Sequence, residues 1–178
     1  MTINSNAKRR IGSVATAGLG LGLAVGLLAA PAAAGFTYHP LAADSTVQIR
    51  TFVGKCLQIA DSRTDNGAPV VQATCNGAPG QRWNISDGFA VNVNSGKCLE
   101  VPGWSKTQGT AIGQWDCNGG DNQRWGKVNV DGNTLAVVSF DSDLVLDVYG
   151  AGHDDGAPLV QWGGSRYDNE RFTLAPVG

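Results

Sequence analysis

The residues with the clearest capacity for chemistry in this chain are its four cysteines. They fall as two pairs, Cys56 with Cys75 and Cys98 with Cys117, and the members of each pair are 19 residues apart. An even number of cysteines at a repeated spacing is typical of a secreted domain held by disulfide bonds. A four-cysteine zinc site is the alternative, but the sequence has no Cys-x-x-Cys pair and the pairs recur along the chain instead of converging. We therefore predict two disulfides, each of which would constrain the unfolded chain by roughly 3 kcal/mol.

Catalytic chemistry is poorly represented in the sequence. The only histidines are His39 and His153, and neither a Gly-x-Ser-x-Gly motif nor a pair of histidines at metal-ligand spacing occurs. A glycosidase could act with two carboxylates alone, but it would need a deep cleft and one carboxylic acid with a raised pKa. The adjacent Asp154 and Asp155 are better interpreted as a turn. We expect no enzymatic activity, no metal site and no cofactor.

The chain contains three copies of a repeat of about 42 residues. Gln-Arg-Trp at residues 81–83 recurs as Gln-Arg-Trp at 123–125 and as Glu-Arg-Phe at 170–172, at offsets of 42 and then 47 residues. The same offsets relate three further sets of positions: Cys56, Cys98 and Val145; Gly67, Gly109 and Gly156; Cys75, Cys117 and Gly164. The five additional residues of the third copy fall between Trp125 and Val145, where we expect a longer loop or hairpin. A fixed period of this size indicates units that bury their apolar faces against one another.

The first 34 residues differ from the rest of the chain. They contain three consecutive basic residues at positions 8 to 10, no acidic residue, a long run of Ala, Gly and Leu, and a final Ala-Pro-Ala-Ala-Ala. This layout predicts a secretory signal peptide over residues 1–34, cleaved after Ala34, and therefore a secreted protein. A transmembrane helix over residues 11–34 is the alternative, but the small residues at its end favour cleavage. We assign residues 35–45 to an N-terminal lead-in.

Composition limits what the remaining 144 residues can bind. They carry 10 basic and 15 acidic side chains, a formal net charge of −5, which argues against nucleic acid or an anionic membrane as partner. A chain of this length can bury one core, so we predict a single domain over residues 46–178 and expect a monomer. Its three units span about residues 46–87, 88–129 and 130–178.

The local pattern predicts short strands and no long helix. Gly and Pro supply 32 of the 178 residues, so breakers interrupt almost every stretch of ten. Two β-rich segments open each copy: residues 47–53 and 56–59, residues 89–93 and 98–101, and residues 135–138 and 145–148. A third strand is expected before each second cysteine position, and a fourth contains the aromatic residue of the closing phrase. Four strands per unit also describe a propeller blade, but three units are too few for a propeller, so a closed barrel is the better solution.

At this point the motifs resemble those of a known family. Gly-Lys-Cys-Leu at residues 54–57 and 96–99, Cys-Asn-Gly at 75–77 and 117–119, and Asn-Gln-Arg-Trp at 122–125 are similar to the ricin-B-type lectins, whose repeat carries a Q-x-W motif. The match covers about residues 45–176. The resemblance implies an all-β fold, a β-trefoil of three repeated four-stranded units. It also implies that Trp83, Trp125 and Phe172 are core residues and not sugar contacts.

The resemblance further implies a shallow sugar site in each unit. Sugar recognition needs a flat apolar surface together with a carboxylate and an amide that bind adjacent hydroxyls. The third copy matches the family at Asp147, Trp162 and Asn169, whereas Glu170 stands where the family has Gln. We predict that these four residues form the main carbohydrate site, and that the loop with His153, Asp154 and Asp155 borders it.

The other two copies match less well. The second offers Glu100, Trp115, Asn122 and Gln123, a possible second carbohydrate site in which the longer acid would push its carboxylate outward. The first has Gln58, Ala73 and Gly80 at the equivalent positions, and we expect it only to complete the barrel.

The sequence therefore predicts a secreted lectin without catalysis, which recognises a galactose-like sugar or a plant or microbial polysaccharide mainly through its third repeat. The alternative is a β-trefoil that has lost sugar binding and acts as a protein-interaction or protease-inhibitor domain. Glu170 favours that alternative, as do Val71, Gly113 and Val160, which occupy a position where family sites often have a further Gln.

Overall fold

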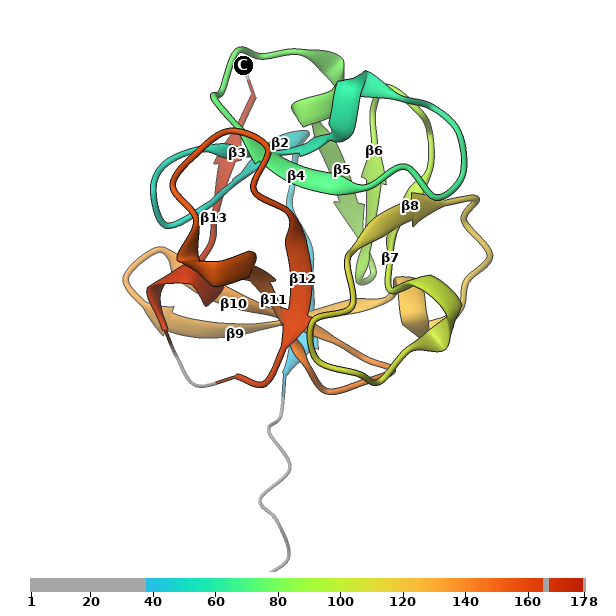
Figure 1. The fold of residues 1–178 in the computed structure, drawn as a ribbon, viewed down its shortest axis with the longest axis vertical. Coiled ribbons are helices and arrows are strands. Elements are labelled where there is room, and N and C mark those ends of the chain that lie inside the picture. Colours follow the sequence, from blue (N-terminus) through green and yellow to red (C-terminus); the bar gives the residue numbers. More distant parts are fainter. Residues whose placement is uncertain (1–37, 165–166, 178) are drawn as a thin grey trace, which may run out of the picture. The chain divides into compact units, whose positions relative to one another are not determined.

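The computed structural model describes residues 38–164 and 167–177 (Figure 1). The predicted signal peptide, residues 1–34, and the first residues of the lead-in, 35–37, lie outside the described residues. Within the part that is described, no helix is long and apolar enough to cross a membrane.

Each of the three predicted units contributes four strands, after a short strand β1 (His39–Pro40) that pairs with β9. The first unit has β2 (Val47–Arg50), β3 (Cys56–Ile59), β4 (Val70–Ala73) and β5 (Trp83–Ser86). The second has β6 (Phe89–Asn92), β7 (Cys98–Glu100), β8 (Gly113–Trp115) and β9 (Trp125–Asp131). The third has β10 (Thr134–Ser139), β11 (Val145–Val148), β12 (Leu159–Trp162) and β13 (Thr173–Pro176).

Two short 3-10 helices accompany each set of strands, one after the second strand and one before the fourth. They are η1 (Ala60–Ser62) and η2 (Pro79–Gln81), η3 (Pro102–Trp104) and η4 (Asp121–Gln123), and η5 (Tyr149–Ala151) and η6 (Asp168–Glu170).

The first and fourth strands of the units close into a ring. β2 pairs with β5, β5 with β6, β9 with β10 and β13 with β2, all antiparallel. Two single bridges, Phe89 with Arg124 and Leu135 with Phe172, complete the ring where β6 meets β9 and β10 meets β13. A closed barrel removes the free sheet edges that would otherwise invite aggregation.

The second and third strands form one hairpin in each unit: β3 with β4, β7 with β8 and β11 with β12. Single bridges join the three hairpins to one another in a circle: Pro69 with Gly113, Ala111 with Val160, and Val71 with Pro158. A six-stranded barrel with three linked hairpins is the β-trefoil that the sequence predicts (Figure 1).

The aromatic residues of the three closing phrases meet in the core, as predicted. Trp83 and Trp125 are fully buried and Phe172 is 1% exposed. A buried indole N–H needs an acceptor, and Trp83 donates to the carbonyl oxygen of Leu57 at 3.3 Å while Trp125 donates to that of Leu99 at 3.0 Å. Phenylalanine at the third position has no such donor and fills the same place by packing alone.

The structure contains both predicted disulfides, Cys56–Cys75 and Cys98–Cys117, each with its Cα atoms 5.1 Å apart. The third unit replaces the bond by packing. A Cβ on Gly164 would lie only 3.1 Å from Cγ1 of Val145, so the valine side chain already occupies the space that a second side chain would need.

Two segments differ in length from a regular repeat. Strand β2 ends at Arg50, three residues before the end of the predicted segment, because the chain turns there and the N–H of Gly54 bonds to the carbonyl oxygen of Thr51 at 2.8 Å. Strands β9 and β10 have 7 and 6 residues, whereas β5 and β6 have 4 each. The five additional residues of the third copy therefore lengthen this hairpin.

A glutamine on the third strand of each unit holds the loop of a neighbouring unit. Its side-chain N–H groups bond to two backbone carbonyls at 2.8 to 3.1 Å: Gln72 to Gly152 and Asp154, Gln114 to Arg63 and Asp65, and Gln161 to Ser105 and Thr107. The sequence analysis missed these contacts, although the three glutamines follow the 42 and 47 offsets. They fix the loops next to the positions predicted to bind sugar.

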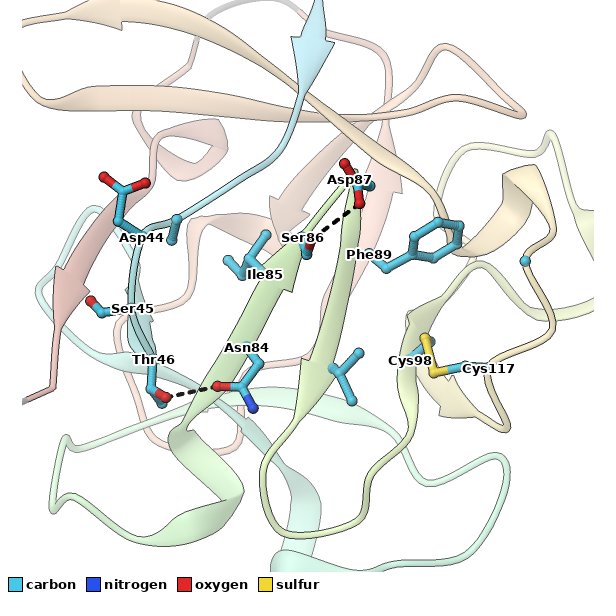
Figure 2. Close-up of a pocket in the computed structure, with 13 residues that line it drawn as sticks. Asp44, Ser45, Thr46, Asn84, Ile85, Ser86, Asp87, Phe89, Cys98 and Cys117 are labelled. Atoms are coloured by element: carbon cyan, nitrogen blue, oxygen red, sulfur yellow. Dashed lines mark hydrogen bonds between the residues drawn. A yellow bond between two sulfur atoms is a disulfide. The ribbon is translucent and has the colours of Figure 1, made fainter.

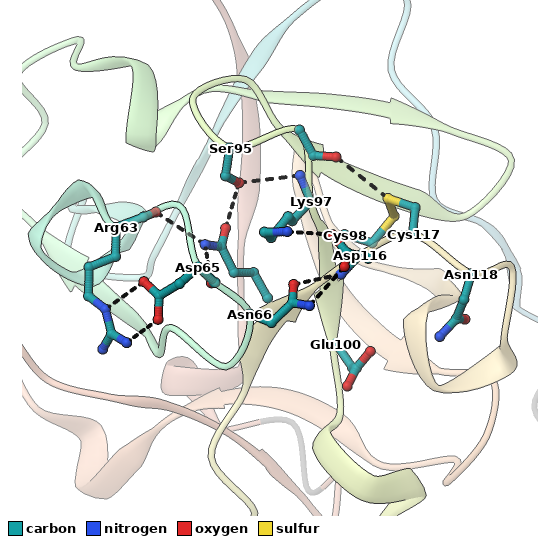
Figure 3. Close-up of polar contacts among 12 residues, drawn as sticks. Arg63, Asp65, Asn66, Ser95, Lys97, Cys98, Glu100, Asp116, Cys117 and Asn118 are labelled. Carbon is teal, nitrogen blue, oxygen red and sulfur yellow. Dashed lines mark hydrogen bonds and ion pairs between the residues drawn. A yellow bond between two sulfur atoms is a disulfide. The ribbon is translucent and has the colours of Figure 1, made fainter.

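Side chains reinforce the same junctions. Figure 3 shows the junction of the first and second units, where Asn66 donates to Asp116 at 2.8 Å and Lys97 forms an ion pair with Asp116. Lys55 and Asp155 form the equivalent ion pair between the first and third units at 2.5 Å. Because the aspartate of each pair is exposed to solvent, we expect these ion pairs to add little to stability.

Candidate functional site

The third unit brings Asp147, Trp162 and Asn169 to one face of a hairpin. Asp147 lies opposite Val160 in the register of β11 and β12, and Trp162 lies opposite Val145, two residues along, so the two side chains point to the same side. Asn169, in η6, donates its amide to Oδ2 of Asp147 at 2.7 Å and to the carbonyl oxygen of Val148 at 3.1 Å. An acid and an amide therefore lie in direct contact beside an aromatic side chain.

Burial divides these residues into a recessed polar pair and an open platform. The Asp147 side chain is 4% exposed, whereas that of Trp162 is 39% exposed. Asn169 bonds to Oδ2 of the recessed carboxylate and not to Oδ1, the other oxygen. Such an arrangement can accept hydrogen bonds from hydroxyl groups while an apolar ring face covers the indole.

Two exposed tyrosines border the same region, and the sequence analysis missed both. Tyr149 opens η5 and is 55% exposed, and Tyr167 immediately precedes η6 and is 65% exposed. Their spacing could have indicated them, because Tyr149 lies two residues after Asp147 and Tyr167 lies two residues before Asn169.

The electrostatics of Asp147 are unusual for an aspartate. Burial, and then the negative charge of Glu170, raise its pKa to about 7. Glu170 is itself 2% exposed, and its Oε2 accepts a bond from the backbone N–H of Tyr167 at 3.2 Å.

The second unit uses its residues differently. The sequence predicts that the Glu100 carboxylate is pushed outward, but in the structure it lies inward. Glu100 is 6% exposed, and Gln123 donates to its Oε2 at 2.6 Å. The amide of Asn122 donates to the carbonyl oxygen of Val101 at 3.1 Å. Burial raises the pKa of Glu100, and the bonds from Gln123 and Asn122 oppose that rise. The longer acid is accommodated by folding inward onto Gln123.

An unpredicted tryptophan lies beside the amide of the second unit. A Cβ on Gly120 would lie 2.8 Å from the Trp104 ring and 2.7 Å from Oδ1 of Asn122, so the ring passes close to that amide. The third unit has the opposite arrangement, with Ala151 at the position of Trp104 and Tyr167 at the position of Gly120. Trp115, the predicted platform, is 44% exposed, so this unit presents two exposed tryptophans.

The first unit lacks the polar pair. Gln58 takes the place of the acid and accepts a bond from Gln81 at 2.8 Å, and Gly80 stands where Asn169 would be. Ser62 fills the adjoining space, because its Oγ would lie 3.2 Å from a Cβ on Gly80. The loop with His153 and Asp155 contacts this unit, through the ring of Phe52 and the ion pair with Lys55.

A cavity of about 580 Å³ lies elsewhere, beside the hairpin of β5 and β6 (Figure 2). Ile85, Phe89 and the Cys98–Cys117 disulfide contribute apolar surface to it, and Asp44 and Asp87 are among its polar residues. The described residues that line it include none of those predicted to contact sugar.

Comparison with known proteins identifies the family. The family model of the ricin-type beta-trefoil lectin domain matches residues 45–172. The designed threefold-symmetric protein ThreeFoil is 31% identical, with a TM-score of 0.72 over 75% of this chain and 100% of its own. The exo-beta-1,3-galactanase 1,3Gal43A from Clostridium thermocellum is 30% identical, with a TM-score of 0.71 over 76% of this chain, which spans 31% of the galactanase.

The C-half of an earthworm R-type lectin is 20% identical and has the same fold, with a TM-score of 0.59 over 74% of this chain and 98% of its own. No curated protein matches the chain. The family match covers nearly the whole trefoil, and the structural matches have the same fold. The chain belongs to the ricin-type beta-trefoil lectin domain family.

Proposed function

We propose that this protein is a secreted lectin that binds carbohydrate through its third unit, without catalysing a reaction. The observation that carries the proposal is the contact of Asp147 with Asn169 at 2.7 Å, on the same hairpin face as the exposed Trp162. Sugar hydroxyls can donate to the carboxylate, which the amide of Asn169 holds in place, while the apolar face of the ring stacks on the indole.

A galactose-like sugar, free or within a plant or microbial polysaccharide, is the ligand class that we propose. The earthworm lectin half was solved in complex with GalNAc, and the galactanase contains a region similar to this chain. Both support a ligand of the galactose type. We propose no catalysis, because the chain matches only 31% of the galactanase and the two acids of the predicted site, Asp147 and Glu170, are both buried and do not face each other across an open cleft.

The second unit is a weaker candidate for the same function. Glu100, Trp115, Asn122 and Gln123 come together there, but the carboxylate is already bonded to Gln123 at 2.6 Å and Trp104 lies beside the amide of Asn122. We propose that this unit contributes less to binding than the third.

Binding of the mature protein to a glycan array and to insoluble polysaccharides tests the proposal. Asp147→Ala should abolish detectable retention, because charge-assisted hydrogen bonds contribute roughly 1.5 to 3 kcal/mol each and a shallow single site has little affinity to lose. Trp162→Ala should act in the same direction through loss of stacking. Gln58→Ala, at the equivalent position of the first unit, is the matched control and should bind like the wild type.

Retention of polysaccharide by Asp147→Ala equal to that of the wild type would refute the third-unit assignment. Loss of binding in Glu100→Ala instead would move the site to the second unit. Absence of binding to every glycan would favour the protein-interaction or protease-inhibitor alternative.

A further inference from the structure

One position distinguishes the third unit from the other two in a way that bears on binding. It is the last residue of the 3-10 helix that precedes the fourth strand: Gln81, Gln123 and Glu170. In the first two units this side chain is an amide donor, which bonds to Gln58 at 2.8 Å and to Glu100 at 2.6 Å. In the third unit it is an acid.

The substitution places two acids together in a buried site. Asp147 is 4% and Glu170 is 2% exposed, and η6 packs against β11. A carboxyl group can donate as the amides do only while it is protonated, and two ionised carboxylates in such a site repel each other. Oε2 of Glu170 accepts the backbone N–H of Tyr167 at 3.2 Å, so this oxygen acts as an acceptor and not as a donor.

We propose that Glu170 makes the third-unit site sensitive to acid, so that the protein holds its sugar above neutral pH and releases it below. This inference rests on the proposed function of the same site. Ionised Asp147 can accept charge-assisted bonds from sugar hydroxyls, whereas protonated Asp147 loses the charge and turns one oxygen into a donor. Binding therefore requires the site to lose its proton.

The surroundings of Asp147 agree with this assignment. Its pKa is raised to about 7 by burial first and by the charge of Glu170 second. Strand β12, which pairs with β11, has no ionisable side chain, and η5 contributes only Tyr149. Asp168 lies two residues before Glu170 and Arg171 directly follows it, and Arg171 forms ion pairs with Asp131 at 3.2 Å and with Asp168 at 3.5 Å.

Binding affinity measured between pH 5 and 9 tests the proposal, with the polysaccharide or glycan that the wild type retains as the probe. The association constant of the wild type should fall below about pH 7 by up to about tenfold per pH unit, as expected when one proton must leave. Glu170→Gln restores the amide donor of the other units, so its affinity should change less than threefold between pH 8 and pH 6. An unchanged pH midpoint in Glu170→Gln would overturn the inference, since a merely structural role would alter affinity without moving the midpoint.

A second measurement needs no sugar and separates this inference from the proposed function. The side-chain carboxyl ¹³C resonance of Asp147 should titrate near pH 7 in the unliganded wild type and at a lower pH in Glu170→Gln, in which burial, the larger cause of the raised pKa, remains. Glu100→Gln, the matched change in the second unit, should leave the Asp147 titration in place. A midpoint for Asp147 below pH 5 in the wild type would refute the acid-sensitive site even if the protein binds sugar. A midpoint near 7 without any sugar binding would refute the proposed function, and with it the release of sugar, while leaving the coupling of the two acids in place.

Discussion

The edge of the Trp162 ring lies against the backbone of Gly109, a residue of the second unit. A Cβ on Gly109 would lie 3.3 Å from Cζ3 of Trp162, and Trp115 lies over Gly67 of the first unit in the same way at 3.8 Å. Each proposed sugar platform is therefore supported by the loop of a neighbouring unit, which a glutamine clamp holds in place.

This support predicts that Gly109→Ala weakens sugar binding several-fold, because the added methyl group would displace the Trp162 ring by a few tenths of an ångström. Gly156→Ala is a matched control. Both glycines have a positive φ, +84° and +89°, so both variants carry a similar backbone strain of roughly 1 kcal/mol, but nothing lies within 4 Å of a Cβ on Gly156. Calorimetric titration of the two variants checks the prediction, and equal affinities would show that the ring does not depend on Gly109.

The two kinds of tryptophan should differ in their effect on stability. Trp125 is fully buried and bonded to Leu99, so Trp125→Ala should lower the free energy of unfolding by about 3 to 5 kcal/mol. Trp162 is 39% exposed, and its replacement by alanine should cost about 1 kcal/mol or less. Thermal melts of both variants measure the contrast. If Trp162→Ala unfolds the protein and Trp125→Ala does not, the alignment of the repeats is wrong.

One of the glutamine clamps is incomplete. Ser95 donates to Oε1 of Gln114 at 2.6 Å and Ser142 donates to that of Gln161 at 2.7 Å, but the first unit has Val53 at this position and Oε1 of Gln72 is buried without a partner. Val53→Ser should supply the missing donor.

The suitable reference for this change is Val53→Ala, which removes the same apolar branches without adding a hydroxyl. We expect Val53→Ser to exceed Val53→Ala in unfolding free energy by about 1 kcal/mol, since an unsatisfied buried acceptor costs about 1 to 3 kcal/mol. Urea denaturation of the pair measures the difference. Equal midpoints would mean that Gln72 is already satisfied, for example by water.

The buried acid pair should also make stability depend on pH. Asp147 has a pKa of about 7 in the folded protein and about 3.9 in an unfolded chain, so the folded state binds more protons between these values. The unfolding free energy should therefore fall as pH rises from about 4 to 7 and should not fall further from this cause above 7.

Asp147→Asn should remove this loss and stabilise the protein by about 1 to 3 kcal/mol at pH 8 relative to pH 4.5. The exposed Asp116 is the control of opposite sign, because its bond to Lys97 lowers its pKa and stabilises the protein only above the unfolded pKa. Asp116→Asn should accordingly give no gain at pH 8. Urea denaturation at both pH values tests the pair of variants, and a wild-type difference retained in Asp147→Asn would show that other groups cause it.

Much of the fold follows from the sequence because the repeat carries its own register. The 42 and 47 offsets align Cys56 with Cys98, and the local spacing of 19 residues is enough to predict both disulfides. The same register identifies Trp125 as a core residue and Trp162 as a surface residue. Burial alternates along a strand, and the position of a residue within the unit fixes the face of the strand on which its side chain lies. The predicted site residues Asp147 and Asn169 come together for the same reason.

The tertiary structure alone decides the contacts between side chains that are distant in sequence or that can adopt several rotamers. The inward turn of Glu100 onto Gln123 and the place of Trp104 beside Gly120 depend on which neighbour offers a partner or a gap, and no spacing encodes that choice. The contact of Trp162 with Gly109 spans 53 residues and arises because threefold closure brings each hairpin onto the preceding loop. Burial of Asp147 beside Glu170, which sets the pKa of the site, likewise exists only once the barrel has closed and excluded water from both acids.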